Sequence, residues 1–596
     1  MALGGCYTGI RGSGSAGGDG ADDAAESAED GSGDAGESGD SGDDPFQTGI
    51  FECDPTQTPT ELPLRRLSRV QYENALRDLM TILVGDQADV LLEAAASRLL
   101  SIPADVKSGP DAKYGGLSRL DQSIFQETVD GTYRVGDAIG KTIIADQGLL
   151  TAAIGPCASD VDASNDAQCI EDFIRRFAPR VLRRPITDDD VAFYVAVAED
   201  TLEVEDYSDI VTVLLAAPEL LYFVEHGVPD ESGAGTQLTA HEIASRLSFH
   251  FWQTIPDDEL VALADSGELL DDAAYEAQVD RMLNDPRTRS ALDEYFGEWL
   301  DAPNLGELDA AVGEPDYDNF LDGFTPGPDT RTNMADEVRE MGAYYTVASP
   351  GSFDEWFRSD KSFARTDDIA TIYGVAPWAE GEPPVLPDGR EGLITRALML
   401  STGSAVTHPI LKGVYARKTL LCDQLPPPPP DAMAVAMGVM DVGLGARAHA
   451  QAISEARADC AGCHETLINP MGFITEDFDA LGRHRTIENV YDKTTGELIG
   501  TAEIDTSTVP RVSTTDERPA STAAELNQFM LESERPQACF ARRYFRFTFG
   551  REEDDVTDGC TLATMHQALL DGTDLGSVVR DIAMRPEFRT KTIEGE

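Results

Sequence analysis

Apolar residues recur every three or four positions along most of the chain after residue 65, which is the spacing of helices with one buried face. The clearest stretch is 65–84. There a Ser68–Gln71 capping box precedes apolar residues at helical spacing, and Gly85 follows as a stop. The pattern predicts one amphipathic helix over this range.

The same reasoning predicts further helices along the chain. Two follow the capping boxes Thr187–Asp190 and Thr239–Glu242, and the second carries His241 and His250, nine residues apart, which we interpret as structural. The other predicted helical ranges are 173–182, 212–299, 333–345, 411–421 and 446–467. Residues 303–329 and 377–392 are predicted loops, and Pro426–Pro430 is predicted to form a stiff polyproline II spacer.

One short motif carries recognisable chemistry, namely Cys460-Ala461-Gly462-Cys463-His464. Cysteines three apart on a helical turn share a face, so both sulfurs can add to the two vinyl groups of a haem while His464 binds the iron. The sequence therefore predicts one covalent haem c. A redox-active Cys-x-x-Cys pair, a structural disulfide and half of a zinc site stay open as alternatives.

The sixth iron ligand would decide the chemistry of such a haem. Met471, seven residues after His464, is a candidate thioether. Further candidates are His449, His484, Met530, Met565 and Met584, and Arg483 and Arg485 are candidates for pairing with haem propionates. A closed iron suits electron transfer, whereas an open one suits peroxide or oxygen chemistry.

A chain of 596 residues exceeds one hydrophobic core. We expect a mainly α fold with several helical domains in series and a small c-type-cytochrome-like helical unit toward the C-terminus. The expected divisions are 1–52 (N-terminus and tether), 53–145, 146–208, 209–345, 346–432 (helical segment and spacer), 433–510 (haem unit) and 511–596.

The net charge of −62, from 108 acids and 46 bases, excludes nucleic acid as a partner because phosphate binding needs a basic face. Only eight of the bases are lysines. We interpret the acidic, lysine-poor surface as an adaptation to salt rather than as a binding site.

The cysteines indicate an oxidising compartment. Apart from Cys460, Cys463 and Cys6, six remain, and they are expected to pair as Cys157–Cys169, Cys539–Cys560 and Cys53–Cys422. The start Met1–Cys6 is similar to the end of a bacterial lipoprotein signal, with Cys6 as the lipidated residue, although an accidental likeness stays open. Residues 12–44 carry eleven acids and no base, so they are predicted to be a solvated tether.

An acidic stretch between Cys157 and Glu171 has the spacing of a calcium-binding loop. Its candidate ligands are Asp160, Asp162, Ser164, Asp166 and Glu171, at loop positions 1, 3, 5, 7 and 12. Asn165 stands where such loops carry glycine. The alternative is an acidic surface loop closed by a disulfide.

Several segments resemble the planctomycete-type cytochrome c-associated proteins, which string together domains of unknown function. The matching segments are 67–79, 173–185, 242–260, 390–394, 460–482 and 539–588, in the family's order. The resemblance implies a secreted or surface-held haem protein, and it carries the haem role only to Cys460, Cys463 and His464.

These observations predict an extracytoplasmic electron-transfer protein with one haem c and an unknown redox partner. We expect it in the periplasm or on the outer membrane or cell surface, in contact with a membrane only through a lipid on Cys6. Two alternatives stay open: a surface interaction or polymer-binding protein, and a haem oxidoreductase with an open iron.

Overall fold

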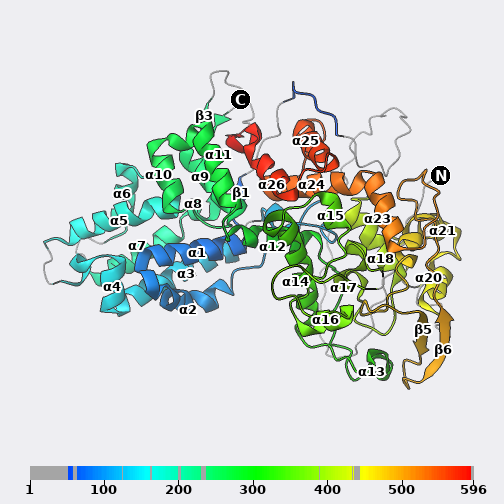
Figure 1. The fold of residues 1–596 in the computed structure, drawn as a ribbon. Coiled ribbons are helices and arrows are strands. Elements are labelled where there is room, and N and C mark those ends of the chain that lie inside the picture. The colour runs from blue at the N-terminus through cyan, green and yellow to red at the C-terminus, as the bar shows by residue number, and fades with distance from the viewer. Residues whose placement is uncertain are drawn as a thin grey trace, which may run out of the picture.

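The computed structural model describes residues 51–591 apart from 58–63, 124, 161–163, 199–202, 230–235, 388, 433 and 435–442. The described residues are mainly α-helical, as expected, with short strands at the edges (Figure 1). Among them, no helix is both long enough and apolar enough to cross a membrane.

The first hydrophobic core lies among the N-terminal helices. The elements are α1 (Arg69–Val84), α2 (Ala88–Leu99), α3 (Gln126–Ala145), α4 (Gln147–Ala153), α5 (Asp166–Leu182), α6 (Asp188–Val195), α7 (Val204–Leu215) and α8 (Pro218–Leu221). The capping boxes at Ser68 and Thr187 form as predicted. The chain before α1 is extended instead of helical, because β1 (Arg65–Arg66) pairs with β2 (Tyr222–Phe223).

The second and larger core includes Phe51, Tyr114 and Leu117, but its helices begin with α9 (Ala240–Phe251), whose Thr239–Glu242 capping box is confirmed. It continues through α10 (Asp258–Ser266), α11 (Asp272–Leu283), α12 (Thr288–Trp299), α13 (Pro315–Leu321), α14 (Thr330–Ala343), α15 (Phe353–Phe357), α16 (Asp367–Tyr373), α17 (Ala397–Leu400), α18 (Pro409–Tyr415), α20 (Ala446–Ser454), α21 (Ala458–Cys463), α22 (Asn469–Phe473), α23 (Ala523–Glu532), α24 (Arg535–Phe549), α25 (Gly559–Leu570), α26 (Leu575–Met584) and α27 (Pro586–Arg589).

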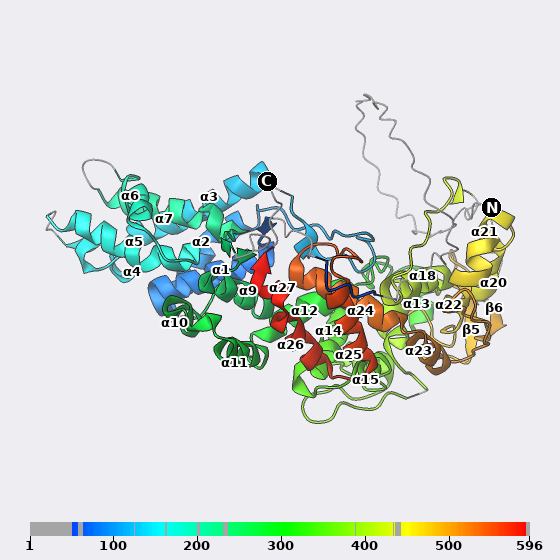
Figure 2. The ribbon, with the colours of Figure 1, turned by 90° about the horizontal axis from the view of Figure 1, so that it is seen from above.

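Two small sheets complete the described fold. Strands β3 (Val228–Pro229), β4 (Thr236–Gln237) and β7 (Thr590–Lys591) bring the end of the chain beside the start of α9. Strands β5 (Ile487–Tyr491) and β6 (Leu498–Glu503) form a hairpin that the sequence pattern did not predict. This hairpin, α20 and α21 lie at one end of the molecule, and α4 and α6 lie at the other (Figure 2).

Helix α24 joins the two halves of the chain (Figure 1). On one side Tyr544 packs against Tyr295 of α12, with ring centroids 5.0 Å apart. On another, the Arg543 guanidinium donates to the backbone carbonyls of Tyr114 and Gly115, at 2.9 and 2.7 Å. The helix therefore contacts residues more than four hundred positions earlier in the chain.

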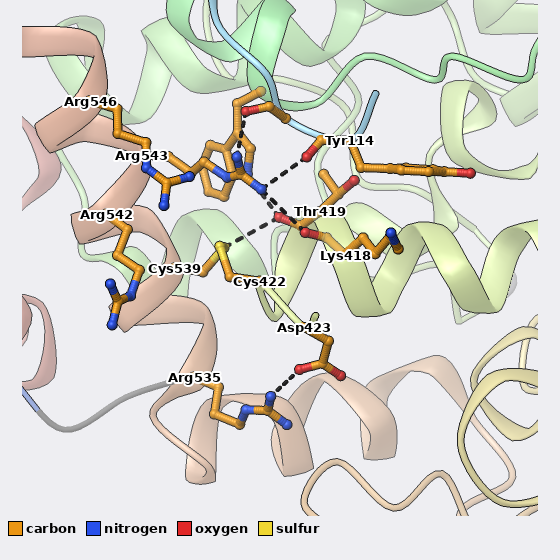
Figure 3. Close-up of a disulfide and its surroundings, with 12 residues drawn as sticks. Tyr114, Lys418, Thr419, Cys422, Asp423, Arg535, Cys539, Arg542, Arg543 and Arg546 are labelled. Atoms are coloured by element: carbon orange, nitrogen blue, oxygen red, sulfur yellow. Dashed lines mark hydrogen bonds and ion pairs between the residues drawn. A yellow bond between two sulfur atoms is a disulfide. The ribbon is translucent and has the colours of Figure 1, made fainter. Parts of the chain in front are cut away.

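Three disulfides link described residues, and they correct two of the three expected pairings. Cys157 bonds Cys169 as predicted, but Cys53 bonds Cys560, and Cys422 bonds Cys539 (Figure 3). The local Cys539–Cys560 pairing is wrong because α24 carries Cys539 to Cys422 in the core, where Cys539 contacts the Thr419 carbonyl oxygen. Sequence separation alone could not supply this tertiary placement.

Replacing Cys53 and Cys560 together by serine should lower the free energy of unfolding by roughly 2–5 kcal/mol, because this bond closes a loop of 507 residues. Replacing Cys157 and Cys169, which close a loop of 12 residues, should cost less. Urea unfolding of the two double variants measures the difference. A larger loss of unfolding free energy in the Cys157/Cys169 variant than in the Cys53/Cys560 variant would contradict the chain-entropy argument.

Candidate functional site

The Cys460–His464 motif lies on one unbroken helical run over residues 458–473. The run consists of α21, a π-helical turn His464–Ile468, and α22. The predicted single helix over 446–467 is wrong, since α20 ends at Ser454 and Arg457 is extended before α21. The run also continues through Pro470 and Gly472. Pro470 stands in the first turn of α22, where a missing N–H is tolerated.

The break between α20 and α21 has a physical reason. It leaves Ser454 and Glu455 turned toward Asn469, whose side-chain amide donates to Ser454 Oγ and to Glu455 Oε1, both at 2.9 Å. A continuous helix would place these groups along one axis instead of bringing the end of α20 back onto α22.

Asn469 in turn holds the imidazole of His464. The Asn469 Oδ1 atom lies 3.2 Å from His464 Nδ1. The Asn469 amide nitrogen already donates to two acceptors, so its oxygen is the acceptor that remains for an Nδ1–H. This fixes the tautomer with the lone pair on Nε2.

The other ring nitrogen of His464 is buried without a hydrogen-bond partner. The residue is fully buried, and Nε2 has no donor or acceptor within reach. Burial is the main reason that the pKa of His464 falls to about 4, so the ring is neutral near pH 7. A neutral imidazole with a free Nε2 lone pair is the form that binds metal ions.

The two cysteines of the motif are also buried, at 3% exposure for Cys460 and 4% for Cys463. They stand three positions apart on α21, as the haem prediction requires. Of the three disulfides between described residues, none joins Cys460 to Cys463. Cys463 carries a thiol, whereas Cys460 is disulfide-bonded, so haem attachment at both sulfurs requires reduction of that bond. The reduced pair together with one oriented imidazole fits a covalently attached haem.

Helix α18 packs closely across the motif run, and two glycines allow this. A Cβ atom added at Gly413 would overlap the carbonyl oxygen of Ile468, and one added at Gly472 would overlap that of Pro409. Next to Gly413 in the chain, buried Lys412 donates to Glu476 Oε1 at 2.5 Å. Glu476 also accepts from Thr407 at 2.7 Å.

A buried arginine fixes the middle of the motif run. Arg417, in a second π-helical turn Ala416–Leu420, donates from Nε to the Leu467 carbonyl at 3.0 Å. π-helical turns leave backbone carbonyls without their usual α-helical partner, so a side-chain donor can take them. Arg417 thereby ties the π-helical turn beside His464 to the second core.

The remaining predicted site residues are placed as follows. Met471 is buried in α22. Arg483 pairs with Asp479 at 2.7 Å, and Arg485 pairs with Glu476 at 3.1 Å, so both guanidiniums already have carboxylate partners. Cys6 lies outside the described residues.

The predicted calcium loop is only partly described, because residues 161–163, and with them Asp162, lie outside. Asp160 and Ser164 are exposed, and Asp166 begins α5. Glu171 pairs with Arg175 at 2.8 Å, while Asn165 donates to Asp160 at 3.0 Å. Among the residues described, no group of three or more His, Cys, Asp and Glu side chains is placed to hold a metal ion. Calcium here stays a prediction.

Asn469, Gly413 and Gly472 were not predicted as site residues. Asn469 and Gly472 follow the motif within the segment that resembles the family. This resemblance was the only feature of the sequence that could have identified them as site residues. Gly413 is brought to the motif by tertiary packing, which one sequence does not reveal.

Replacing Gly413 by alanine should lower the free energy of unfolding by about 1–3 kcal/mol, because the new methyl group meets backbone that cannot move aside cheaply. Gly500 in β6 is the matched control, since a Cβ atom there meets nothing within 4 Å. Urea denaturation of both variants is the measurement. Equal stability of Gly413→Ala and Gly500→Ala would show that the crossing is looser than described.

Three domain families of unknown function match this chain in series. They are PSD5 (DUF1595) at residues 169–225, PSD4 (DUF1592) at 238–375 and PSCyt3 (DUF1588) at 390–488, and the last range includes Cys460–His464. No curated protein and no solved structure matches the chain. Between residues 169 and 488 the chain therefore carries three domains of the planctomycete cytochrome c-associated family.

Proposed function

We propose that this protein is an extracytoplasmic c-type haem protein that passes electrons to or from a redox partner. The observation that carries the proposal is His464, whose buried Nε2 lacks a hydrogen-bond partner while its Nδ1 faces Asn469 Oδ1. A buried polar atom left without a partner costs roughly 1–3 kcal/mol, so its presence beside two cysteines argues for a ligand.

Each residue of the site has a role in this proposal. Cys460 and Cys463 would form the two thioether bonds, and His464 Nε2 would bind the iron. Asn469 would keep the imidazole in the correct tautomer and orientation, as partners of metal-bound histidines do. When bound, haem supplies one-electron redox chemistry.

The compartment follows from the disulfides. Three disulfides among the described residues fit an extracytoplasmic location, where such bonds persist. Attachment to a membrane through a lipid on Cys6 is part of the proposal, and the acidic segment 12–44 would then separate the folded domains from the membrane.

A second candidate function, a haem oxidoreductase with an open iron, is favoured by the continuity of the motif run. His464 and Met471 stand on the same helical run, seven residues and roughly 10 Å apart along its axis. Because a helical run does not turn back on itself, Met471 would not be placed to hold the same iron as His464. We therefore propose that Met471 leaves the sixth position to another residue or to an exogenous ligand.

Full-length protein made together with haem-maturation machinery should carry one haem that survives denaturation. Intact-mass spectrometry should find the added mass of one haem, and Cys460→Ser with Cys463→Ser should remove it. His464→Ala should keep a covalent adduct but change the absorption spectrum, because the iron loses its imidazole.

His226→Ala is the matched control, since His226 is exposed and its hydrogen bond to Glu242 uses the backbone N–H and not the ring. This variant should keep both the mass and the spectrum. A wild-type polypeptide whose mass contains no haem would overturn the proposal.

Carbon monoxide separates the two candidate functions. If the sixth position is open, carbon monoxide should shift the absorption bands of the reduced protein, and the volume-conserving Met471→Leu change should leave the spectrum unaltered. If carbon monoxide leaves the absorption spectrum unchanged and Met471→Leu alters it, Met471 is the sixth ligand. That result would support simple electron transfer.

A further inference from the structure

A second feature lies far from the haem motif, where three distant parts of the chain meet. A cavity of about 30 Å³ is lined by Arg65 and Arg66 of β1, Arg119, residues of α9 including Arg246 and His250, and the end of α24 including Thr548. Five phenylalanines complete its wall (Phe223, Phe249, Phe547, Phe549 and Phe588). We call it the arginine-lined cavity.

The polar groups around the arginine-lined cavity include buried atoms that have no partner. These are Arg65 Nε, Arg66 Nε, His250 Nδ1 and Thr548 Oγ1. His250 and Thr548 are only 4% and 6% exposed, so water outside the protein does not satisfy them. Arginine nitrogens are donors only, and the threonine hydroxyl can donate.

His250 adds a further donor in the tautomer that carries its proton on Nδ1. Its Nε2 lies 3.4 Å from the Tyr544 hydroxyl, and a hydroxyl that donates to Nε2 leaves the proton on Nδ1. Burial, followed by the charges of Arg119 and Arg65, lowers the pKa of His250 to about 3, so the ring is neutral near pH 7. Residues that line the cavity thus carry N–H and O–H groups without hydrogen-bond partners.

The guanidiniums at the cavity pair with carboxylates that do not line it. Glu225 bonds Arg246 at 2.6 Å and also pairs with Arg65 at 3.4 Å, so one carboxylate serves two guanidiniums. Arg119 pairs with Glu294 at 2.9 Å, and Arg66 pairs with Asp105 at 2.7 Å and lies 3.6 Å from Asp121. Among the described residues that line the cavity itself, none is Asp or Glu.

Aromatic stacking keeps the guanidiniums in place. The Arg119 guanidinium lies 3.6 Å from the centre of the Phe547 ring, and that of Arg65 lies 4.4 Å from the centre of Phe223. Such stacking orients the planar guanidinium while its edge nitrogens stay available for hydrogen bonds.

We propose that the arginine-lined cavity binds one small anion, chloride, which joins β1, α9 and α24. The volume of the cavity selects this class of ligand. A single water molecule needs roughly 10–15 Å³ of cavity volume, so a cavity of about 30 Å³ leaves no room for an organic acid. The site is buried within a protein of net charge −62. The surface of this protein repels anions, so it does not collect them nonspecifically.

The test uses the full-length protein in sodium gluconate, titrated with sodium chloride at constant ionic strength. Gluconate screens charge equally but is too large for the cavity, so chloride should raise the unfolding temperature along a saturating curve. Thr548→Val removes one donor and keeps the shape, and it should raise the half-saturating chloride concentration about tenfold.

Thr212→Val is the matched control. Its buried hydroxyl donates to the Ser208 carbonyl at 2.7 Å within α7, away from the cavity, so this variant should lose stability and keep the chloride response. Identical unfolding temperatures in chloride and gluconate would overturn the proposal. A crystal grown in bromide gives an independent measurement, since an anomalous peak beside Thr548 and His250 supports the site and water alone overturns it.

Discussion

Buried guanidinium groups are the constraint on which the arrangement of the second core depends. A buried arginine must have its N–H groups satisfied, and here the acceptors are backbone carbonyls and a few buried carboxylates. Arg417 donates to the carbonyls of Leu467, Pro510 and Arg511 at 3.0, 2.7 and 2.6 Å, and it pairs with Asp423, which also pairs with Arg535 of α24 (Figure 3). One side chain thus joins the motif run to the segments around Pro510 and Asp423. Removing it would leave Asp423 with one cation and several buried carbonyls without donors.

This constraint reaches the Cys460–His464 motif through the π-helical turn. The Leu467 carbonyl that Arg417 binds lies three residues after His464, and Asn469 lies five residues after it. The run is therefore fixed on one side by Arg417 and on the other by the end of α20, through Ser454 and Glu455. An imidazole held from both sides keeps one orientation, which a metal ligand requires. The orientation of His464 is thus a result of the whole second core and not of the five-residue motif.

The sequence was informative where the relevant physics is local. The capping boxes at Ser68, Thr187 and Thr239, the mainly helical fold and the Cys157–Cys169 bond all involve residues close in the chain. The motif residues could be singled out for the same reason. The other features depend on residues 14 to 507 positions apart in the chain. They are the Cys53–Cys560 and Cys422–Cys539 bonds, the hydrogen bonds of Asn469 at the break after Ser454, and the contact of Gly413 with Ile468. Periodicity and spacing carry no information about such partners.

The two sites that we propose differ in the charge and hydrogen-bonding character of the groups around them. The surface is acidic, while several arginines are buried and paired, as Arg396 is with Glu337 at 2.9 Å. At the haem motif the arginines nearby have carboxylate or carbonyl partners, so the vacant atom is a neutral imidazole nitrogen that suits a metal. At the arginine-lined cavity the vacant atoms belong to guanidinium, hydroxyl and imidazole donors, which suit an anion. The two sites therefore differ in the chemistry of what they can bind, and α24, which contacts Tyr295 of α12 and the backbone of Tyr114 and Gly115, is the element through which occupancy of the cavity would stabilise the rest of the fold.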